Sequence, residues 1–383
     1  MKRLGIVCLA VLLAVGLLPG RTWATELEVK AKSAVLIDAA TGTVLYESNS
    51  HEALPPASVT KIMTMLLVME AIDSGKIGWE DMVTASETAA AKGGSQIYLK
   101  VGESMPVTTL LKSVAVASAN DAACALAEHI AGSEGAFVEQ MNQRAAELGM
   151  QDTHFVNCTG LDDEDTAMQH RTSAYDIALM SRELLVNHPQ IKKFTTIWMD
   201  TIRDGAFGLA NTNKLVRFYP GATGLKTGYT SKAGFCLSAS AERDGMELIA
   251  VVLGSDSSAD RFAACKQLLD HGFATYALIA PKLDSAVSVP VKLGKQSSVA
   301  AVTSGENAIL IDKGQKKSVT TEIVMTEEVT APVSQGQRLG TMTVRCGEQI
   351  LAQIPLVAQT AVERLSWGEL FAYVLRHICF AGE

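Results

Sequence analysis

The spacing of apolar residues changes along the first half of the chain. Two β-rich runs between residues 33 and 46 flank a turn at Gly42, which predicts a hairpin. From about residue 58 to 74 the period becomes helical, with one apolar stripe made of Ile62, Met65, Leu66, Met69 and Ile72. Helical patterns then dominate to about residue 188, over 110–131, 136–149 and 173–187.

Strands return after this helical stretch. Three β-rich runs occupy 224–230, 234–241 and 247–253, and the last two are joined across Asp244-Gly245, a strong hairpin signal. A helix from Asp260 to about Tyr276 is expected next, with Asp260 as its N-cap. A hairpin at one end and a β-meander at the other predict an α+β fold: one antiparallel sheet flanked by helices, with a helical region inserted between its strands.

Pro281 marks the expected end of this first domain, which would cover residues 25–281. Beyond it, short alternating β runs separated by glycine turns occupy 286–291, 308–311, 318–324, 341–344 and 350–355. This pattern predicts a small all-β sandwich over residues 282–358.

The last segment, 363–380, has the pattern of an amphipathic helix. Its apolar face consists of Trp367, Leu370, Phe371, Val374 and Ile378, and its polar face of Glu369, Tyr373, Arg376 and His377. The helix is too short and too charged to span a bilayer, so we expect residues 359–383 to lie in a membrane interface. The alternative, that the helix packs on its own β-domain, stays open because most amphipathic helices face a core.

The first 24 residues have the organisation of a secretory signal peptide. Lys2 and Arg3 precede the uncharged apolar run 4–18, and small residues at Thr22 and Ala24 suit cleavage after Ala24. An uncleaved amphiphilic anchor is the alternative, although the run is short for a membrane span. We therefore expect an exported protein at the outer face of the cytoplasmic membrane.

Charge and cysteine usage exclude several classes of function. The formal net charge is −8, and the predicted signal carries only basic charges, so the mature chain is more acidic still. No basic footprint for nucleic acid is present. The cysteines form no C-x-x-C pair, and Cys124 and Cys236 are interpreted as small buried apolar residues. Because histidines and cysteines do not cluster at ligand spacing, we expect no metal and no cofactor.

The sequence Ser58-Val-Thr-Lys61 places a hydroxyl and an amine one helical turn apart. A serine becomes a good nucleophile only when an adjacent base takes its proton, and lysine can be that base if its pKa falls toward about 7–8. A helix N-terminus at Ser58 would also supply N–H groups for an oxyanion. The alternative is a capping serine beside a solvated lysine, and S-x-x-K alone is a weak signal.

Two further motifs follow in order. Ser118-Ala-Asn120 lies where two helical runs meet, so both polar residues could simply cap a helix. The functional alternative is that Ser118 transfers a proton, and that Asn120 forms hydrogen bonds to the substrate and to Lys61. Lys226-Thr227-Gly228 lies in a predicted strand, where a lysine suits an anionic ligand and a glycine lets a substrate backbone approach. An exposed edge lysine followed by a turn glycine is the alternative.

These three motifs resemble those of the penicillin-binding proteins and β-lactamases. The chain is most similar to their low-molecular-mass branch, the D-alanyl-D-alanine carboxypeptidases. The likeness covers 33–355 and includes Ala34-Val-Leu-Ile-Asp, Pro56-Ala-Ser-Val-Thr-Lys-Ile-Met-Thr, Ser118-Ala-Asn-Asp-Ala, Gly221-Ala-Thr-Gly-Leu-Lys-Thr-Gly and Ala233-Gly-Phe. The resemblance implies a β-lactamase/transpeptidase-like fold, and the β-domain and terminal helix resemble the family's non-catalytic domain and membrane anchor.

The resemblance also implies the reaction and its residues. Ser58 would be acylated, Lys61 would be its base, and the enzyme would remove the terminal D-alanine from peptidoglycan stem peptides ending in D-Ala-D-Ala. β-Lactam antibiotics would acylate the same serine. The resemblance implies further roles for other residues. Ser118 and Asn120 would transfer a proton and align the substrate, and Lys226, Thr227 and Gly228 would line the substrate strand. The backbone N–H groups of Ser58 and Tyr229 would hold the oxyanion, and Arg261 would bind the substrate's terminal carboxylate.

Three other functions remain open from the sequence. A β-lactamase shares the motifs but needs a deacylating base, and Glu183-Leu-Leu-Val-Asn187 superficially resembles the E-x-x-L-N pattern that supplies one. That segment continues a helical stripe, so we interpret it as a helix end. A D,D-endopeptidase would use the same acylation. A non-catalytic peptidoglycan-binding scaffold is disfavoured because every motif residue is intact.

Overall fold

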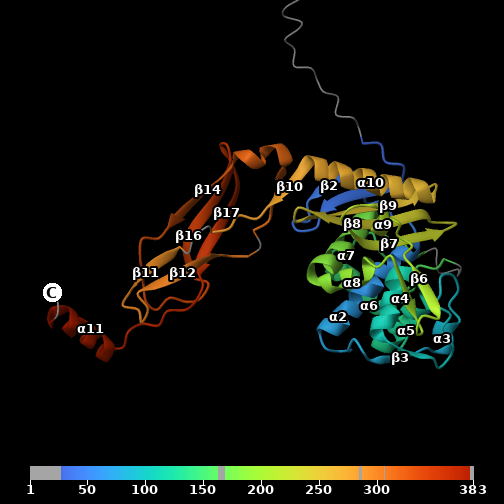
Figure 1. Cartoon of the computed structure of the whole chain (residues 1–383), viewed down its shortest axis with the longest axis horizontal. Helices are drawn as coiled ribbons and strands as arrows, with labels where there is room; N and C mark the ends of the chain where they lie inside the picture. The colour runs from blue at the N-terminus through green and yellow to red at the C-terminus, as the bar shows by residue number, and fades with distance from the viewer. Residues whose placement is uncertain (1–26, 163–168, 284–286, 306, 380–383) are drawn as a thin grey trace, which may run out of the picture.

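One five-stranded antiparallel sheet is built from both ends of the first domain (Figure 1). The computed structural model describes residues 27–162, 169–283, 287–305 and 307–379, so the predicted signal peptide lies outside the described residues. The strand order is β2-β1-β9-β8-β7, with β1 at Ser33–Asp38, β2 at Val44–Ser48, β7 at Ala222–Thr230, β8 at Gly234–Arg243 and β9 at Met246–Ser255. The α+β prediction is confirmed, because β1 pairs with β9 across the whole inserted helical region.

Helices cover both faces of this sheet. Along β1, Val35 and Ile37 pack with the helical region, whereas Ala34 and Leu36 pack beneath α10 (Ser258–Thr275). The period of two sends alternate side chains into two separate cores, which explains why all six residues of β1 are buried. Figure 1 shows α10 on one side of the sheet and the inserted helices on the other.

The inserted region forms the larger core. Its helical elements are η1 (Ala57–Thr60), α2 (Lys61–Asp73), α3 (Glu87–Ala90), α4 (Val107–Ala117), α5 (Asn120–Ala131), α6 (Glu134–Glu147), α7 (Ala174–Asn187), η3 (Pro189–Ile191) and α8 (Lys192–Thr195). The short helix α9 (Leu215–Phe218) instead packs through Leu215 into the core beneath α10. Ten of the thirteen residues of α2 are buried, so this helix lies inside the helical layer and is covered on more than its predicted apolar stripe.

The predicted hairpins and helix ends are largely correct, with two differences. Gly42 has a φ of 72°, and Asp244 and Gly245 have φ values of 52° and 77°, as tight turns between these strands require. The N-cap of α10 is Ser257, whose hydroxyl accepts the Asp260 N–H, so the prediction of Asp260 as the cap is wrong. The helical stretch predicted over 110–131 breaks into α4 and α5 at Ser118.

Two short hairpins in the helical region were not predicted. They consist of β3 (Met82–Thr84) with β4 (Ser104–Pro106), and β5 (Met199–Ile202) with β6 (Phe207–Ala210). Strands of three or four residues leave too short an alternation in the sequence to be recognised.

The second domain is all-β, as predicted. β10 (Tyr276–Ile279) leaves α10 and pairs with β13 (Ile309–Asp312). Six other strands form one hydrogen-bonded sheet in the order β14-β16-β17-β12-β11-β15, around a core that includes Val289, Leu339 and Leu356. Their bounds are β11 Ser288–Lys292, β12 Ser298–Thr303, β14 Val319–Met325, β15 Val329–Thr330, β16 Arg338–Cys346 and β17 Gln349–Ala358, and η4 (Lys313–Ser318) precedes β14.

The final helix, α11 (Trp367–Cys379), lies at the far end of the β-domain from the first domain (Figure 1). Trp367 is 88% exposed and Phe371 68%, and Val374 and Leu375 are also exposed. The apolar face of α11 is therefore not packed on the β-domain. Among the described helices, none is both long and apolar enough to cross a bilayer.

Gly221, immediately before β7, provides a test of how closely the chain packs against β8. It has a φ of +81°, and an added Cβ would lie 2.3 Å from the carbonyl oxygen of Glu242 on β8. We expect Gly221→Ala to lower the free energy of unfolding by more than about 2 kcal/mol, because left-handed strain of about 1–2 kcal/mol adds to an overlap with backbone. Urea denaturation measures the loss.

Gly245→Ala is the matched control, since Gly245 has a φ of +77° with no atom within 4 Å of the added Cβ. Its loss should be confined to the backbone strain. Equal losses for the two variants would show that the approach of Glu242 to Gly221 does not matter.

Candidate active site

The candidate nucleophile lies on a short 3-10 turn that leads directly into the buried helix α2. Ser58 is the second residue of η1, and Lys61 is the first residue of α2. Lys61 Nζ lies 2.9 Å from Ser58 Oγ. The structure thus brings this hydroxyl and this amine into hydrogen-bonding contact, which is the geometry that proton transfer between them needs.

Lys61 is completely buried, which changes its acid–base chemistry. Burial lowers the pKa of Lys61 to about 7, although the nearby Cys158 and Asp121 act in the opposite direction. Its Nζ also donates a hydrogen bond of 2.7 Å to the carbonyl oxygen of Thr159. Near neutral pH a substantial fraction of this amine is therefore uncharged and able to accept a proton.

Ala57, immediately before the serine, has a left-handed backbone with a φ of 49°. Its carbonyl oxygen accepts a hydrogen bond of 2.8 Å from Thr60 Oγ1, and Thr60 Oγ1 in turn lies 2.8 Å from His170 Nε2. Gly160 packs against the same carbonyl, where an added Cβ would lie only 1.8 Å from the oxygen. These contacts fix a conformation that a non-glycine residue rarely adopts, and they fix it next to Ser58.

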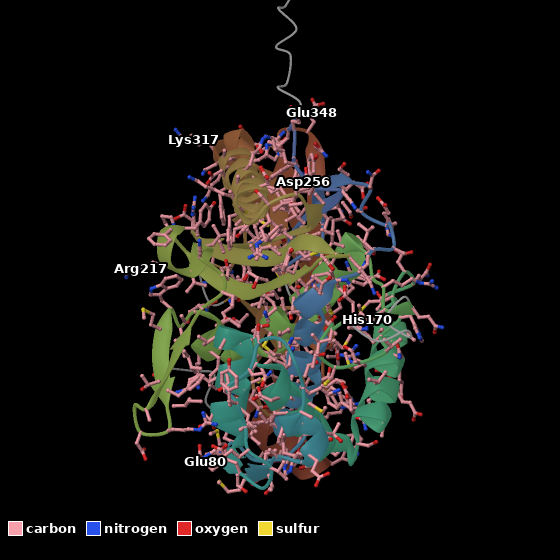
Figure 2. The ribbon with its side chains drawn as sticks, turned by 90° about the vertical axis from the view of Figure 1, so that its right-hand side faces the viewer. Glu80, His170, Arg217, Asp256, Lys317 and Glu348 are labelled. Carbon is pink, nitrogen blue, oxygen red and sulfur yellow. The ribbon has the colours of Figure 1, made fainter. Side chains whose placement is uncertain are left out.

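His170 was not identified from the sequence, because a single histidine in a loop carries no pattern. Figure 2 labels it below the sheet, among the helices. Its Nδ1 accepts the N–H of Val156 at 3.1 Å, so the neutral ring donates from Nε2 to Thr60. Burial, together with the nearby charges of His154 and Lys61, lowers the pKa of His170 to about 4. The ring therefore stays neutral while it supports the nucleophile turn.

Ser118 and Asn120 lie at the junction of α4 and α5. Ser118 ends α4 as its C-cap with a φ of 62°, and the N-cap of α5 is Ala119 with no side-chain cap, so neither motif side chain caps the start of α5. Asn120 Nδ2 donates to the carbonyl oxygen of Gly93 at 2.6 Å, while its buried Oδ1 has no partner among the described residues. The expected Asn120–Lys61 hydrogen bond is not formed; Lys61 bonds to Thr159 instead.

Lys226, Thr227 and Gly228 lie on β7, the edge strand beside η1. Lys226 is fully buried, so the alternative of an exposed edge lysine is wrong. Burial, followed by the charges of Lys61 and Arg261, lowers the pKa of Lys226 well below its usual range. A Cβ on Gly228 would lie 2.7 Å from the carbonyl oxygen of Pro56 and 3.1 Å from the Ser58 nitrogen. A glycine is required here because the strand passes directly against the serine turn.

Thr212 connects the second motif with the third. Thr227 Oγ1 donates to Thr212 Oγ1 at 2.7 Å, and the Thr212 N–H donates to the carbonyl oxygen of Val116 near the end of α4 at 3.2 Å. The hydroxyl of Thr227 is therefore oriented by a residue that the sequence motifs do not include. No sequence signal identifies Thr212, because its role depends on a contact between distant segments.

Arg261 projects from α10 toward β7 and is only 8% exposed, unlike an ordinary surface arginine. Its Nη1 donates to the carbonyl oxygen of Gly228 at 2.8 Å, and its buried Nε has no partner among the described residues. Tyr229 is 57% exposed and its ring lies against Phe235, with centroids 4.3 Å apart. Only the backbone of Tyr229 was expected to take part, so the outward side chain is compatible with that expectation.

The glutamate that resembles a β-lactamase base is used elsewhere. Glu183 accepts a hydrogen bond of 2.6 Å from Arg144 Nη2, and Arg144 Nε bonds to Glu70 at 2.7 Å. Glu70 is nine residues beyond Lys61 on α2, which corresponds to a rise of about 13 Å along the helix. Glu183 therefore belongs to an ion-pair network at the far end of α2, and residues 183–187 form the last part of α7, as predicted.

Comparisons with known proteins agree with this site. Residues 21–257 match the family model of D-alanyl-D-alanine carboxypeptidase, peptidase S11, and residues 276–364 match that of the penicillin-binding protein 5 C-terminal domain. D-alanyl-D-alanine carboxypeptidase DacF of Bacillus subtilis (strain 168) is 46% identical over 346 residues, which are 89% of this chain and 88% of the relative.

Solved structures give the same result. Penicillin-binding protein 5 from Haemophilus influenzae superimposes with a TM-score of 0.73 at 31% identity, covering 88% of this chain and 98% of that one. The ampicillin-bound form of penicillin-binding protein D2 from Listeria monocytogenes has a TM-score of 0.58 at 32% identity, covering 64% and 98%. With Ser58 hydrogen-bonded to the buried Lys61 beside the Lys226 strand, the chain belongs to the peptidase S11 family and is a serine-type D-alanyl-D-alanine carboxypeptidase.

Proposed function

We propose that Ser58 is the residue acylated in this carboxypeptidase and that Lys61 is its base. The single observation that supports this most directly is the 2.9 Å contact between Lys61 Nζ and Ser58 Oγ, made by a completely buried lysine. In the first step the neutral Lys61 takes the hydroxyl proton while Ser58 Oγ bonds to the carbonyl carbon before the terminal D-alanine. The amine leaves with a proton, and water then hydrolyses the ester.

The substrate is proposed to bind along β7. Edge strands present unpaired backbone groups, and an extended stem peptide can add to them as a further strand. Asn120 Oδ1, a buried acceptor without a partner, suits an N–H of the substrate. Ser118, beside it, would pass the proton to the leaving amine. The backbone N–H groups of Ser58 and Tyr229 would hold the oxyanion.

The terminal carboxylate is proposed to bind near Lys226, Thr227 and Arg261. Besides burial, the charge of the nearby Arg261 contributes to lowering the pKa of Lys226. Two basic side chains this close together favour an anionic ligand. Arg261 has a buried Nε still available for a hydrogen bond, and a guanidinium can grip a carboxylate through two parallel bonds.

The place of action is proposed to be the outer face of the cytoplasmic membrane, after cleavage of the signal at Ala24. The support is the apolar surface of α11, where Trp367 and Phe371 are mostly exposed. A soluble domain rarely exposes such a set of large apolar side chains without a surface to bind. The β-domain would then be a spacer between the membrane and the catalytic domain.

The rate of acylation should follow the protonation of Lys61. Since only the neutral amine can act as the base and its pKa is about 7, the rate constant for acylation by a fluorescent penicillin should rise about tenfold from about pH 6 to 8 and then level off. Lys61→Arg, which stays charged, should lose a factor of about 10²–10⁴ and show no such rise. A flat or falling profile in the native enzyme would rule out Lys61 as the base.

Arg261→Gln should weaken recognition of the free carboxylate. Loss of a charged hydrogen bond of about 1.5–3 kcal/mol predicts a KM about 10–100-fold higher for a peptide ending in D-Ala-D-Ala. The preference for that peptide over its C-terminal amide should shrink in the same proportion, which a general structural defect would not produce. Arg345→Gln, on the distant strand β16, is the control and should change neither quantity.

The apolar face of α11 should mediate vesicle binding. The double change Trp367→Ser and Phe371→Ser removes the two most exposed aromatic rings of that face, so co-sedimentation with anionic lipid vesicles should fall by at least tenfold. Gly368→Ser, on the same helix with open space around it, is the control and should bind as the native chain does. Undiminished sedimentation of the double variant would refute anchoring by this face.

A further inference from the structure

Two cysteines that are far apart in sequence meet behind the active site. Cys124 lies on α5, and Cys158 lies in the loop between α6 and α7; both are completely buried. Glu134, the first residue of α6, lies between them. One ligand atom from each of the three residues lies within 4.8 Å of the other two. No sequence pattern indicated this cluster, because its members do not have the spacing of metal ligands.

The carboxylate of Glu134 is already shared by both thiols. Cys158 Sγ lies 3.2 Å from Glu134 Oε1, and Cys124 Sγ lies 3.9 Å from Oε2. Lys92 Nζ bonds to the same Oε2 at 2.6 Å. Although burial opposes it, the hydrogen bond from Lys92 and its charge keep the pKa of Glu134 below its usual range, so the carboxylate is ionised.

We propose that Cys124, Glu134 and Cys158 bind a thiophilic divalent cation such as Zn²⁺ or Cd²⁺. With Zn–S near 2.3 Å and Zn–O near 2.0–2.2 Å, tetrahedral zinc separates its ligand atoms by about 3.5–3.8 Å, so the three atoms need only small shifts. Glu134 can ligate through Oε1 while Lys92 stays on Oε2, as a supporting partner of the ligand. A water molecule would complete the coordination.

The charge balance of binding is favourable. Both thiols release their protons to solvent as the cation enters, so the two lost protons match the two charges gained. The three side chains carry one negative charge before binding, and the three side chains together with the cation carry one negative charge after it, so the pairing with Lys92 is preserved. Because both thiols must lose their protons before they can ligate, affinity should increase with pH.

A cleft of about 350 Å³, lined by Lys92, Glu134, Asn157 and Thr159 among others, reaches the carboxylate that lies between the two buried thiols. The side chains of Lys92 and Glu134 are each 17% exposed at this cleft. The other group of possible ligands among the described residues, Glu70, Glu183 and His188, differs because it contains no thiol and both of its glutamates pair with the one guanidinium of Arg144.

Binding can be measured without any enzymatic assay. The full chain, reduced and stripped with a chelator, should take up one Zn²⁺ in competition with a chromophoric chelator, and Cd²⁺ should give thiolate-to-cadmium charge-transfer absorbance. Cys124→Ser and Cys158→Ser should each weaken binding at least tenfold and abolish that absorbance. Cys346→Ser, a half-exposed cysteine of the β-domain, is the matched control and should retain both.

Thermal melting guards against variants that are merely less stable. Zn²⁺ should raise the melting temperature of the native chain and of Cys346→Ser, because a cation that binds only the folded state stabilises it. It should leave Cys124→Ser, Cys158→Ser and Glu134→Gln unshifted, whatever their starting temperatures. Uptake below one Zn²⁺ per chain, or uptake and melting shifts that survive the two serine changes, would overturn the proposal.

The site is coupled to Lys61 through the backbone. Thr64 Oγ1 donates to the carbonyl oxygen of Cys158 at 2.6 Å, and Lys61 Nζ donates to that of Thr159 at 2.7 Å. Drawing Cys158 toward the cation would move the Thr159 carbonyl, and a misplacement of about 1 Å can cost about 100-fold in rate. This consequence rests on the proposed acylation of Ser58. Saturating Cd²⁺ should slow penicillin acylation at least tenfold in the native chain but not in Cys158→Ser. An unchanged rate in the native chain would refute the coupling to Lys61. The measurements of metal binding would not be affected by that outcome.

Discussion

The proposed chemistry of this enzyme depends on the burial of one ammonium group. Lys61 is the first residue of α2, a helix that is itself surrounded by other helices, and no part of its side chain reaches solvent. Removing a lysine from water disfavours its charged form, and the pKa of about 7 follows from that cost. A solvated lysine in the same place would stay protonated at neutral pH and could not take the proton of Ser58. In the proposed mechanism the fold therefore creates the base by burying Lys61.

Three segments that are distant in sequence hold this pair in place. The carbonyl of Thr159 receives one hydrogen of Lys61, His170 and Thr60 fix the carbonyl before Ser58, and Gly228 brings β7 against the serine nitrogen. The site thus lies between the helical layer and the edge of the sheet. Because β1 pairs with β9, the sheet that carries β7 is complete only when both ends of the domain have come together. Local strain at Ala57 and Ser118 is maintained by that closed structure.

The sequence predicted the parts of this arrangement that have a short-range signature. The turn at Gly42, the Asp244-Gly245 hairpin and the three motifs each combine a residue type with a fixed local spacing. The supporting residues lack such a signature. Thr159 acts through a backbone carbonyl, Thr212 through a hydroxyl that meets Thr227 only in the folded chain, and neither function restricts the sequence around it.

The wrong predictions have the same cause: contacts between distant segments leave no local pattern in the sequence. Asp260 is a good capping residue by type, but Ser257 is better placed because the helix begins earlier. Asn120 was expected to bond to Lys61, yet the nearby Thr159 carbonyl takes that hydrogen bond. Cys124 is buried as expected. Its proximity to Cys158 depends on how α5 packs against a loop, and no spacing in the sequence indicates it.

We propose that Ser58 carries the acyl group. The most direct measurement is mass spectrometry of the protein after exposure to penicillin, followed by proteolytic mapping of the adduct. The account predicts one penicilloyl group per chain, on the peptide that contains Ser58, and no adduct in the Ser58→Ala variant. An adduct on another peptide, or one that persists without the Ser58 hydroxyl, would contradict it.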